Sequence, residues 1–174
     1  MTAAEATHQG RLDGAVTLRP MRWWDIEHVA ELERLAFLQD SWSTGQFWAE
    51  LAGVPDSGHY LVADRGGAVV GYAGLAVLAD EGWVQTIAVR VDRRGRGVGA
   101  SLLAALVAEA RRRRVVAVLL EVRVDNEPAL GLYERFGFER LAVRRGYYAN
   151  GTRDAAVLRL SLQQPALQGR AVEK

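Results

Sequence analysis

The chain has 174 residues, of which 49% are hydrophobic, and its formal net charge is +1. This length supplies one well-buried core but too little chain for two ordinary domains, and the near-neutral charge gives no overall attraction to nucleic acid. The absence of cysteine excludes disulfides, thiolate metal ligands and a thiolate nucleophile, and the histidines His8, His28 and His59 are too scattered to suggest a metal site.

The two ends of the sequence differ from its middle. Residues 1–14 and 163–174 are small or polar without periodicity, so we expect two mobile tails around one domain at residues 15–162. The N-terminal segment lacks the apolar core of a signal peptide, and no apolar run reaches the roughly 18 residues that span a bilayer. These features predict a cytoplasmic protein that does not bind membranes.

The first part of the domain predicts one strand and two helices. Residues 16–19 have the pattern of a short strand. A helix then begins at Trp24 or Asp25, with apolar positions at Ile26, Val29, Leu32, Ala36 and Phe37. The spacing of Ser43 and Gln46 is that of a capping box, which predicts a second helix with an apolar face of Phe47, Trp48 and Leu51.

The middle of the chain predicts three antiparallel strands and then a crossover. Residues 60–64, 69–77 and 83–89 have the composition of strands, and short turns join them. Apolar positions at helical spacing predict a helix that begins after the glycines at 95–99 and ends in the arginines at 111–114. The strand at 115–124 is apolar enough to lie in the middle of the sheet, and a right-handed crossover makes it parallel to 83–89.

The last part predicts a helix and a hairpin. Pro128 begins a helix that runs to about Phe136, where Gly137 stops it, and its inward face contains Ala129, Leu132, Tyr133 and Phe136. Residues 138–145 and 155–162 pair as strands around a turn at Asn150-Gly151. The predicted order of elements is β-α-α-β-β-β-α-β-α-β-β, which belongs to the α+β class.

The most informative segment is RRGRGVGASLL, which runs from Arg93 to Leu103. Glycines let the main chain approach a ligand, and the first turn of the following helix offers unpaired N–H groups and the positive end of the helix dipole. The side chains of Arg93, Arg94 and Arg96 add positive charge, which a purely structural turn does not need. We predict a site for a phosphorylated ligand, with a simple tight turn as the alternative.

The same glycines also match a dinucleotide-binding pattern. The segment from Gly95 to Ala100 fits G-x-G-x-x-A, and Glu121 follows at about the expected interval. However, the segment Arg90 to Arg94 separates the preceding strand from the first glycine, and the upstream strands are antiparallel. The chain also cannot supply the repeated β-α-β units of a doubly wound sheet, so NAD binding is the less favoured interpretation.

Ordered motifs across the domain resemble those of a known family. The segment from Arg94 to Gly99 resembles the Arg/Gln-x-x-Gly-x-Gly/Ala acetyl-CoA motif of the GNAT superfamily of N-acetyltransferases, and the element order from about Val16 to Leu162 resembles that fold. Within the superfamily, TIAV, RRGRGVGASLL, LLEVRVDN, ALGLYERFGF and RRGYY are similar to segments of the ribosomal-protein alanine N-acetyltransferases. The resemblance implies the GNAT fold, a mixed and mostly antiparallel sheet of about seven strands with helices on both faces.

The resemblance also implies a site for acetyl-CoA as co-substrate, without a metal. The pantetheine arm would hydrogen-bond the strand edge at Ile87, Ala88 and Val89, and Asn126 would lie near the thioester. The pyrophosphate would bind the main-chain amides from Gly95 to Ala100, with counter-charge from the neighbouring arginines Arg93, Arg94 and Arg96. The implied cofactor-binding segment, which we call the glycine loop, consists of Arg94, Gly95, Arg96, Gly97, Val98, Gly99, Ala100 and Ser101.

Two residues are candidates for proton transfer. Glu121 interrupts an apolar strand, where an unpaired carboxylate is costly, so we assign it as the base that accepts a proton from the acceptor ammonium. The alternative is a structural salt bridge with Arg123, on the same strand face. The resemblance implies that Tyr133 protonates the leaving thiolate, whereas periodicity alone favours a core aromatic with a satisfied hydroxyl.

The remaining steps need no further side chain. A main-chain N–H between Ile87 and Val89 would stabilise the oxyanion. Because the chain has no cysteine, no acetyl-thiol enzyme can form, and we predict direct transfer within a ternary complex.

The resemblance implies where and on what the enzyme acts. A peptide N-terminus would enter near Trp42 and near Tyr147 and Tyr148, although all three can instead be packing residues. The family's usual Pro-Trp-Ser is Ser41-Trp42-Ser43 in this chain. We expect acetylation of a protein N-terminal α-amine, with the N-terminal alanine of a small-subunit ribosomal protein as the implied acceptor. The alternatives are a small-molecule amine or a lysine side chain as acceptor, or a non-catalytic acyl-CoA sensor.

Overall fold

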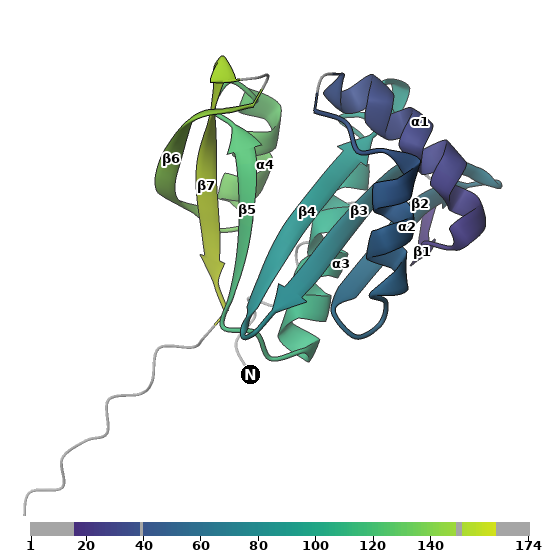
Figure 1. Cartoon of the computed structure of the whole chain (residues 1–174), viewed down its shortest axis with the longest axis horizontal. Helices are drawn as coiled ribbons and strands as arrows, with labels where there is room; N and C mark the ends of the chain where they lie inside the picture. Colours follow the sequence, from purple (N-terminus) through teal and green to yellow (C-terminus); the bar gives the residue numbers. More distant parts are fainter. Residues whose placement is uncertain (1–15, 39, 149–150, 163–174) are drawn as a thin grey trace, which may run out of the picture.

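One mixed sheet organises the part of the chain that the structure describes, with the strand order β1-β2-β3-β4-β5-β7-β6 (Figure 1). The computed structural model describes residues 16–38, 40–148 and 151–162. The strands are β1 (Val16–Pro20), β2 (Gly58–Arg65), β3 (Ala68–Leu78), β4 (Glu81–Val89), β5 (Ala117–Arg123), β6 (Glu139–Tyr148) and β7 (Arg153–Ser161). Only β4 and β5 pair in parallel, which confirms the predicted order and the α+β class.

Helices cover both faces of this sheet. Over the described ranges they are α1 (Ile26–Phe37), α2 (Thr44–Ala52), α3 (Val98–Arg112) and α4 (Glu127–Arg135), with short 3-10 helices η1 (Trp23–Asp25) and η2 (Val91–Arg93). Figure 1 shows α1 and α2 in front of β2–β4, with α3 and α4 behind the sheet. Each pair of helices encloses its own hydrophobic core against one face.

The core under α3 and α4 confirms two predicted helix faces. The apolar positions of α3 are buried, namely Leu102, Leu103, Leu106, Val107 and Ala110. Each large aliphatic side chain buried in this way contributes roughly 1.5–3 kcal/mol to folding. On α4, Tyr133 is buried, the predicted companions Ala129, Leu132 and Phe136 pack partly buried on the same core, and Gly137 (φ +85°) follows the last turn.

The core under α1 and α2 confirms one predicted cap and corrects one predicted packing residue. Ser43 and Gln46 form the capping box, in which the Gln46 N–H donates to Ser43 Oγ over 3.3 Å and the Ser43 N–H donates to Gln46 Oε1 over 2.8 Å. Phe47 is buried, but the prediction for Trp48 is wrong because 50% of it is exposed. Trp48 instead stacks on the exposed Trp23, with ring centroids 6.4 Å apart.

The parallel ladder between β4 and β5 is short, and its end creates the feature on which the site is built. The pairing runs from Glu81 opposite Ala117 to Val84 opposite Leu120 and then stops. Beyond this point the strands diverge toward the top of Figure 1. We call the point where the ladder ends, at Val84 and Leu120, the fork.

A β-bulge in β4 lies at the fork. Gly74 pairs with Thr86 and Leu75 with Val84, so Gln85 is an extra residue in the ladder with β3. Val84 therefore packs in the core under α3, whereas Ala88 packs in the core under α1. Because a bulge increases local twist and bends its strand, this irregularity turns β4 away from β5.

Several predictions concern residues that lie wholly or partly outside the described ranges. They are the two tails at 1–14 and 163–174, and Asn150 of the predicted hairpin turn. Among the described helices, none has the length and apolar character needed to cross a membrane.

Gly74 provides a test of the packing at the bulge. A Cβ on this residue would overlap the ring of Tyr60, which is itself buried. We expect Gly74→Ala to lower the free energy of unfolding by about 1–3 kcal/mol, measured by urea denaturation. Gly45→Ala on α2 is the control, since its Cβ would contact only Ser43 Oγ at 3.8 Å and should be neutral or slightly stabilising. Equal effects of the two substitutions would contradict this account.

Candidate functional site

The β4 edge beyond the fork has one side available to a ligand. Residues 86–89 pair with β3 on one side, from Thr86 opposite Gly74 to Val89 opposite Gly71. On the other side the ladder with β5 has already ended. The predicted binding residues Ile87, Ala88 and Val89 all lie on this edge, where main-chain groups can pair with an extended ligand that carries amides.

The glycine loop leads from this edge to the N-terminus of α3. Gly95 (φ +72°) and Gly97 (φ +83°) have left-handed conformations, which glycine adopts without strain. Gly97 is the N-cap of α3 and makes no side-chain cap, so the first-turn amides of Val98, Gly99 and Ala100 have no acceptor within the helix. Together these N–H groups offer donors to an anion at the positive end of the helix dipole.

The ends of the predicted loop have partners within the chain. The Ser101 N–H donates to the Gly97 carbonyl over 2.9 Å, and the Arg94 N–H donates to the Val91 carbonyl over 3.3 Å. The Arg94 side chain also donates through Nε to the Val89 carbonyl over 3.0 Å. The main-chain donors predicted for the phosphate, from Gly95 to Ala100, lie between these two bonded ends.

Glu121 is the first residue of β5 beyond the fork. Its side chain is 14% exposed, and its Oε1 atom forms an ion pair with the guanidinium of Arg144 on β6. Hydrogen bonding to Glu121 is also the main cause of a raised pKa at Tyr147. The carboxylate is thus held at the fork by two side chains from β6.

The predicted alternative for Glu121, a structural salt bridge with Arg123, names the wrong partner. Arg123 binds Asp125 through two hydrogen bonds of 2.8 and 3.0 Å, and not Glu121. Glu121 does form a salt bridge, but its partner is Arg144, which lies 23 residues away in sequence. The segment RRGYY, which begins at Arg144, is visibly basic in the sequence. Spacing along one strand could not reveal that Arg144 pairs with Glu121 on another.

Tyr147 and Tyr148, which are predicted to contact the acceptor peptide, lie next to Glu121. The rings of Tyr147 and Tyr148 pack edge to face with centroids 4.9 Å apart, and the guanidinium of Arg144 lies 5.3 Å from the Tyr147 ring centroid. The Tyr148 hydroxyl donates to the main-chain oxygen of Glu121 over 3.3 Å. Burial, with smaller effects from Glu121, Tyr147 and Asp40, raises the pKa of Tyr148 to about 12.

Tyr133 lies on α4, and Asn126 lies at the N-terminus of the same helix. Tyr133 is buried and packs against Phe138, and burial raises its pKa, with a smaller effect from the nearby Tyr148. Asn126 is the N-cap of α4, where its side-chain oxygen accepts from the Ala129 N–H over 3.3 Å. The cap holds the Asn126 side chain through its oxygen and does not use its NH₂ group.

Trp42 lies on the opposite side of the fork, in the segment between α1 and α2. Its ring packs against Phe47 with centroids 5.4 Å apart. Two residues earlier, Asp40 is close enough to Arg123 and Tyr148 to raise the pKa of both, as a smaller contribution in each case. The segment from Asp40 to Trp42 therefore approaches the β5 and β6 residues across the fork.

A further carboxylate near this site was not predicted. Glu33 on α1 is 2% exposed and accepts hydrogen bonds from the Trp42 N–H (3.0 Å), the Thr86 hydroxyl (3.4 Å) and the Tyr72 hydroxyl. Burial raises the pKa of Glu33 to about 7, although the Trp42 and Thr86 hydrogen bonds oppose this shift. A sequence signal existed, because Glu33 follows Ile26 and Val29 at the spacing of the buried helix face.

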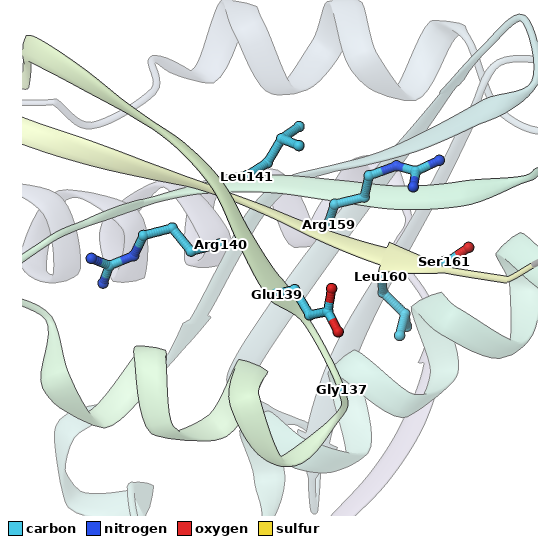
Figure 2. A pocket seen from close by; sticks show the side chains of 7 residues that line it. All are labelled: Gly137, Glu139, Arg140, Leu141, Arg159, Leu160 and Ser161. Carbon is cyan, nitrogen blue, oxygen red and sulfur yellow. The ribbon is translucent and has the colours of Figure 1, made fainter.

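A surface pocket of about 330 Å³ lies elsewhere on the sheet (Figure 2). Figure 2 shows side chains of β6 and β7 around it, and the lining residues are Gly137, Glu139, Arg140, Leu141, Arg159, Leu160 and Ser161. On β7 these residues follow Val157, which pairs with Glu121. The pocket contains none of the predicted site residues, so its size does not identify it as the functional site.

Known proteins resemble this chain in sequence. The sequence model of the acetyltransferase (GNAT) family matches residues 21–138. The N-alpha-acetyltransferase RimI of Mycobacterium tuberculosis is 39% identical over 156 residues, which cover 87% of this chain and 96% of that protein.

Two crystal structures extend the likeness to the fold. The ribosomal-protein-S18-alanine N-acetyltransferase from Escherichia coli has a TM-score of 0.77 and 27% identity, with coverage of 89% of this chain and 99% of that one. Ard1 from Thermoplasma volcanium has a TM-score of 0.78 and 26% identity, with coverage of 86% and 99%. The expected fold is confirmed.

The raised pKa of Glu33 predicts a pH dependence of stability. Between its ordinary value of 4.5 and its folded value of about 7, the folded state binds more protons than the unfolded state, so stability falls as pH rises through this window. Glu33→Gln removes this titration. We expect the free energy of unfolding of Glu33→Gln, relative to wild type, to rise by about 1–3 kcal/mol across the window, as measured by urea denaturation at several pH values.

The matched control for this measurement is Glu31→Gln, an exposed position on the same helix. Its difference from wild type should change much less with pH. If the difference in free energy of unfolding between Glu33→Gln and wild type does not change with pH, the buried carboxylate titrates alike in the folded and unfolded chains.

Proposed function

The chain belongs to the acetyltransferase (GNAT) family, and we propose that it transfers the acetyl group of acetyl-CoA to the N-terminal α-amine of a protein. The observation that carries this proposal is the carboxylate of Glu121 at the fork, between the open β4 edge and the tyrosines of β6. The proposed acceptor is the N-terminal alanine of a small-subunit ribosomal protein, which is supported by the similarity to the Escherichia coli ribosomal-protein-S18 enzyme. The reaction would then take place in the cytoplasm.

The residues beside the fork fit acetyl-CoA. A donor molecule must present a diphosphate and, at some distance, an arm with two amides. The amides from Gly95 to Ala100 supply donors for the diphosphate at the positive end of α3. The edge at Ile87, Ala88 and Val89 supplies main-chain groups for the arm, which leads toward the fork and Glu121.

Glu121 is the proposed proton acceptor. The attacking amine must be neutral, and a protein α-amine has a pKa of about 7.7–8.0, well below the roughly 10.4 of a lysine side chain. A carboxylate at the fork, acting directly or through water, can remove this proton more readily from an α-amine than from lysine. Arg144, which is itself largely exposed, occupies one oxygen of the carboxylate, and an incoming ammonium can replace it.

Tyr133 is the proposed proton donor to the departing thiolate. Its burial in the core raises its pKa and keeps the hydroxyl protonated at neutral pH. Because the chain has no cysteine, the amine attacks the thioester directly, and both substrates must be bound together. The main-chain N–H groups at Ile87 to Val89 are the proposed donors to the oxyanion.

An acceptor panel tests the proposed function. The protein is incubated with acetyl-CoA and peptides that begin with alanine, with peptides whose only free amine is on lysine, and with small amines such as polyamines and amino acids. Mass spectrometry should detect one added acetyl group on the alanine peptides, at their α-amine. Acetylation of small amines alone, or of lysine side chains alone, would contradict the proposal. Binding of acetyl-CoA with no product from any acceptor would favour a sensor.

Substitution of the two proton-transfer residues tests their roles. We expect Glu121→Gln and Tyr133→Phe each to lower kcat about 100-fold or more, with small changes in the KM for acetyl-CoA, because proton transfer contributes about 10²–10⁴-fold. The controls are Glu134→Gln, which is exposed on α4, and Tyr60→Phe, whose hydroxyl binds Glu50 on the other side of the sheet. Full turnover by either site variant would remove that residue from the mechanism.

A further inference from the structure

The buried carboxylate of Glu33 has no part in the proposed chemistry. It belongs to what we call the Glu33 cluster, which consists of Glu33, Tyr72, Thr86 and the main chain of Trp42. Its members come from four separate parts of the fold: α1, β3, β4 and the segment between α1 and α2. Glu33 is the member that contacts all the others.

Two members of the cluster lie at positions that matter for catalysis. Thr86 follows the bulge and is the first residue of β4 to pair with β3 beyond the fork. Trp42 belongs to the acceptor side of the site, and its N–H donates to Glu33 Oε1 over 3.0 Å. The carboxylate therefore links the acceptor segment to the strand that would carry the donor.

The cost of this arrangement argues against a purely structural role. A buried carboxylate loses several kcal/mol of hydration, and well-packed apolar replacements of such groups are often neutral or stabilising. The two hydroxyls can also hydrogen-bond each other, since Tyr72 Oη and Thr86 Oγ1 are 3.1 Å apart. The Trp42 N–H is the group for which the carboxylate supplies the acceptor.

We propose that Glu33 is a positioning residue for the acceptor, which holds the main chain at Trp42 against β4 and so sets the acceptor side of the fork. The inference rests on the proposed function, because it takes Trp42 to contact the acceptor. The glycine loop and α3, which would hold the diphosphate, lie on the other face of the sheet, so this part of the donor site does not depend on the link.

Glu33→Ala tests the proposal by two independent measurements. The first is amide hydrogen exchange, in which the Trp42 N–H should exchange at least tenfold faster than in wild type while core amides of β3 and α3 are unchanged. The second is kinetics with an alanine peptide, in which the KM for the peptide should rise about tenfold and the KM for acetyl-CoA should stay within twofold. Unchanged exchange at Trp42, or a parallel rise of both KM values, would overturn the proposal.

Conservative variants keep the test decisive if Glu33→Ala does not fold. Glu33→Gln retains an oxygen that can accept from the Trp42 N–H, so its peptide KM should stay within threefold of wild type. Thr86→Val keeps the shape of the side chain but removes the link to β4, so its peptide KM should rise about threefold with no change for acetyl-CoA. Glu31→Ala, exposed on α1, is the control and should match wild type. The positioning role would be refuted if the KM values of Glu33→Gln for the peptide and for acetyl-CoA rose together. It would also be refuted if Thr86→Val had the same peptide KM as wild type.

The two measurements also separate this inference from the proposed function. If no alanine peptide is acetylated but Glu33→Ala still accelerates exchange at Trp42, the acceptor assignment is wrong and the link to Trp42 stands. If alanine peptides are acetylated with the same KM by Glu33→Ala and wild type, the function stands and the positioning role is wrong.

Discussion

The early end of the ladder between β4 and β5 is the constraint on which the rest of the site depends. The two parallel strands pair only from Glu81 and Ala117 to Val84 and Leu120, and the bulge at Gln85 then turns β4 away. Three consequences follow from this one irregularity. The β4 edge gains free main-chain groups, Glu121 becomes the first β5 residue beyond the pairing, and Thr86 turns toward α1. In a fully paired sheet β5 would occupy the β4 edge, and no ligand could pair with it.

The hairpin of β6 and β7 supplies the side chains that contact Glu121 at the fork. Glu121 lies on a central strand, yet its ion-pair partner Arg144 and the neighbouring tyrosines come from β6. The same hairpin therefore orients the proposed base and would form one side of the proposed acceptor site. A shift of β6 would change both at once, which couples the position of the acceptor to the state of the carboxylate.

The sequence was sufficient for features that are encoded locally. Helix faces such as Leu102 to Ala110, the capping box at Ser43 and the positive-φ glycines depend on spacing over a few residues, and the structure has them. Partners across strands were not predictable in this way. Arg123 is near Glu121 in sequence but binds Asp125, while Arg144 reaches Glu121 across β7, which lies between β5 and β6. Trp48 has apolar spacing too, but α2 buries only one side of its stripe, at Phe47.

Glu33 and Glu121 have identical side chains but differ in burial and in their bonding partners. The partner of Glu121, Arg144, is 57% exposed, so water screens the pair and the carboxylate can exchange this cation for another at little cost. Glu33 has no such freedom, because its oxygens are buried and the Trp42 N–H would lose its acceptor if the carboxylate moved. A group that must accept a proton and release it belongs at the accessible position. A group that fixes the main chain beside it belongs at the buried one, so the two surroundings agree with the roles proposed for Glu121 and Glu33.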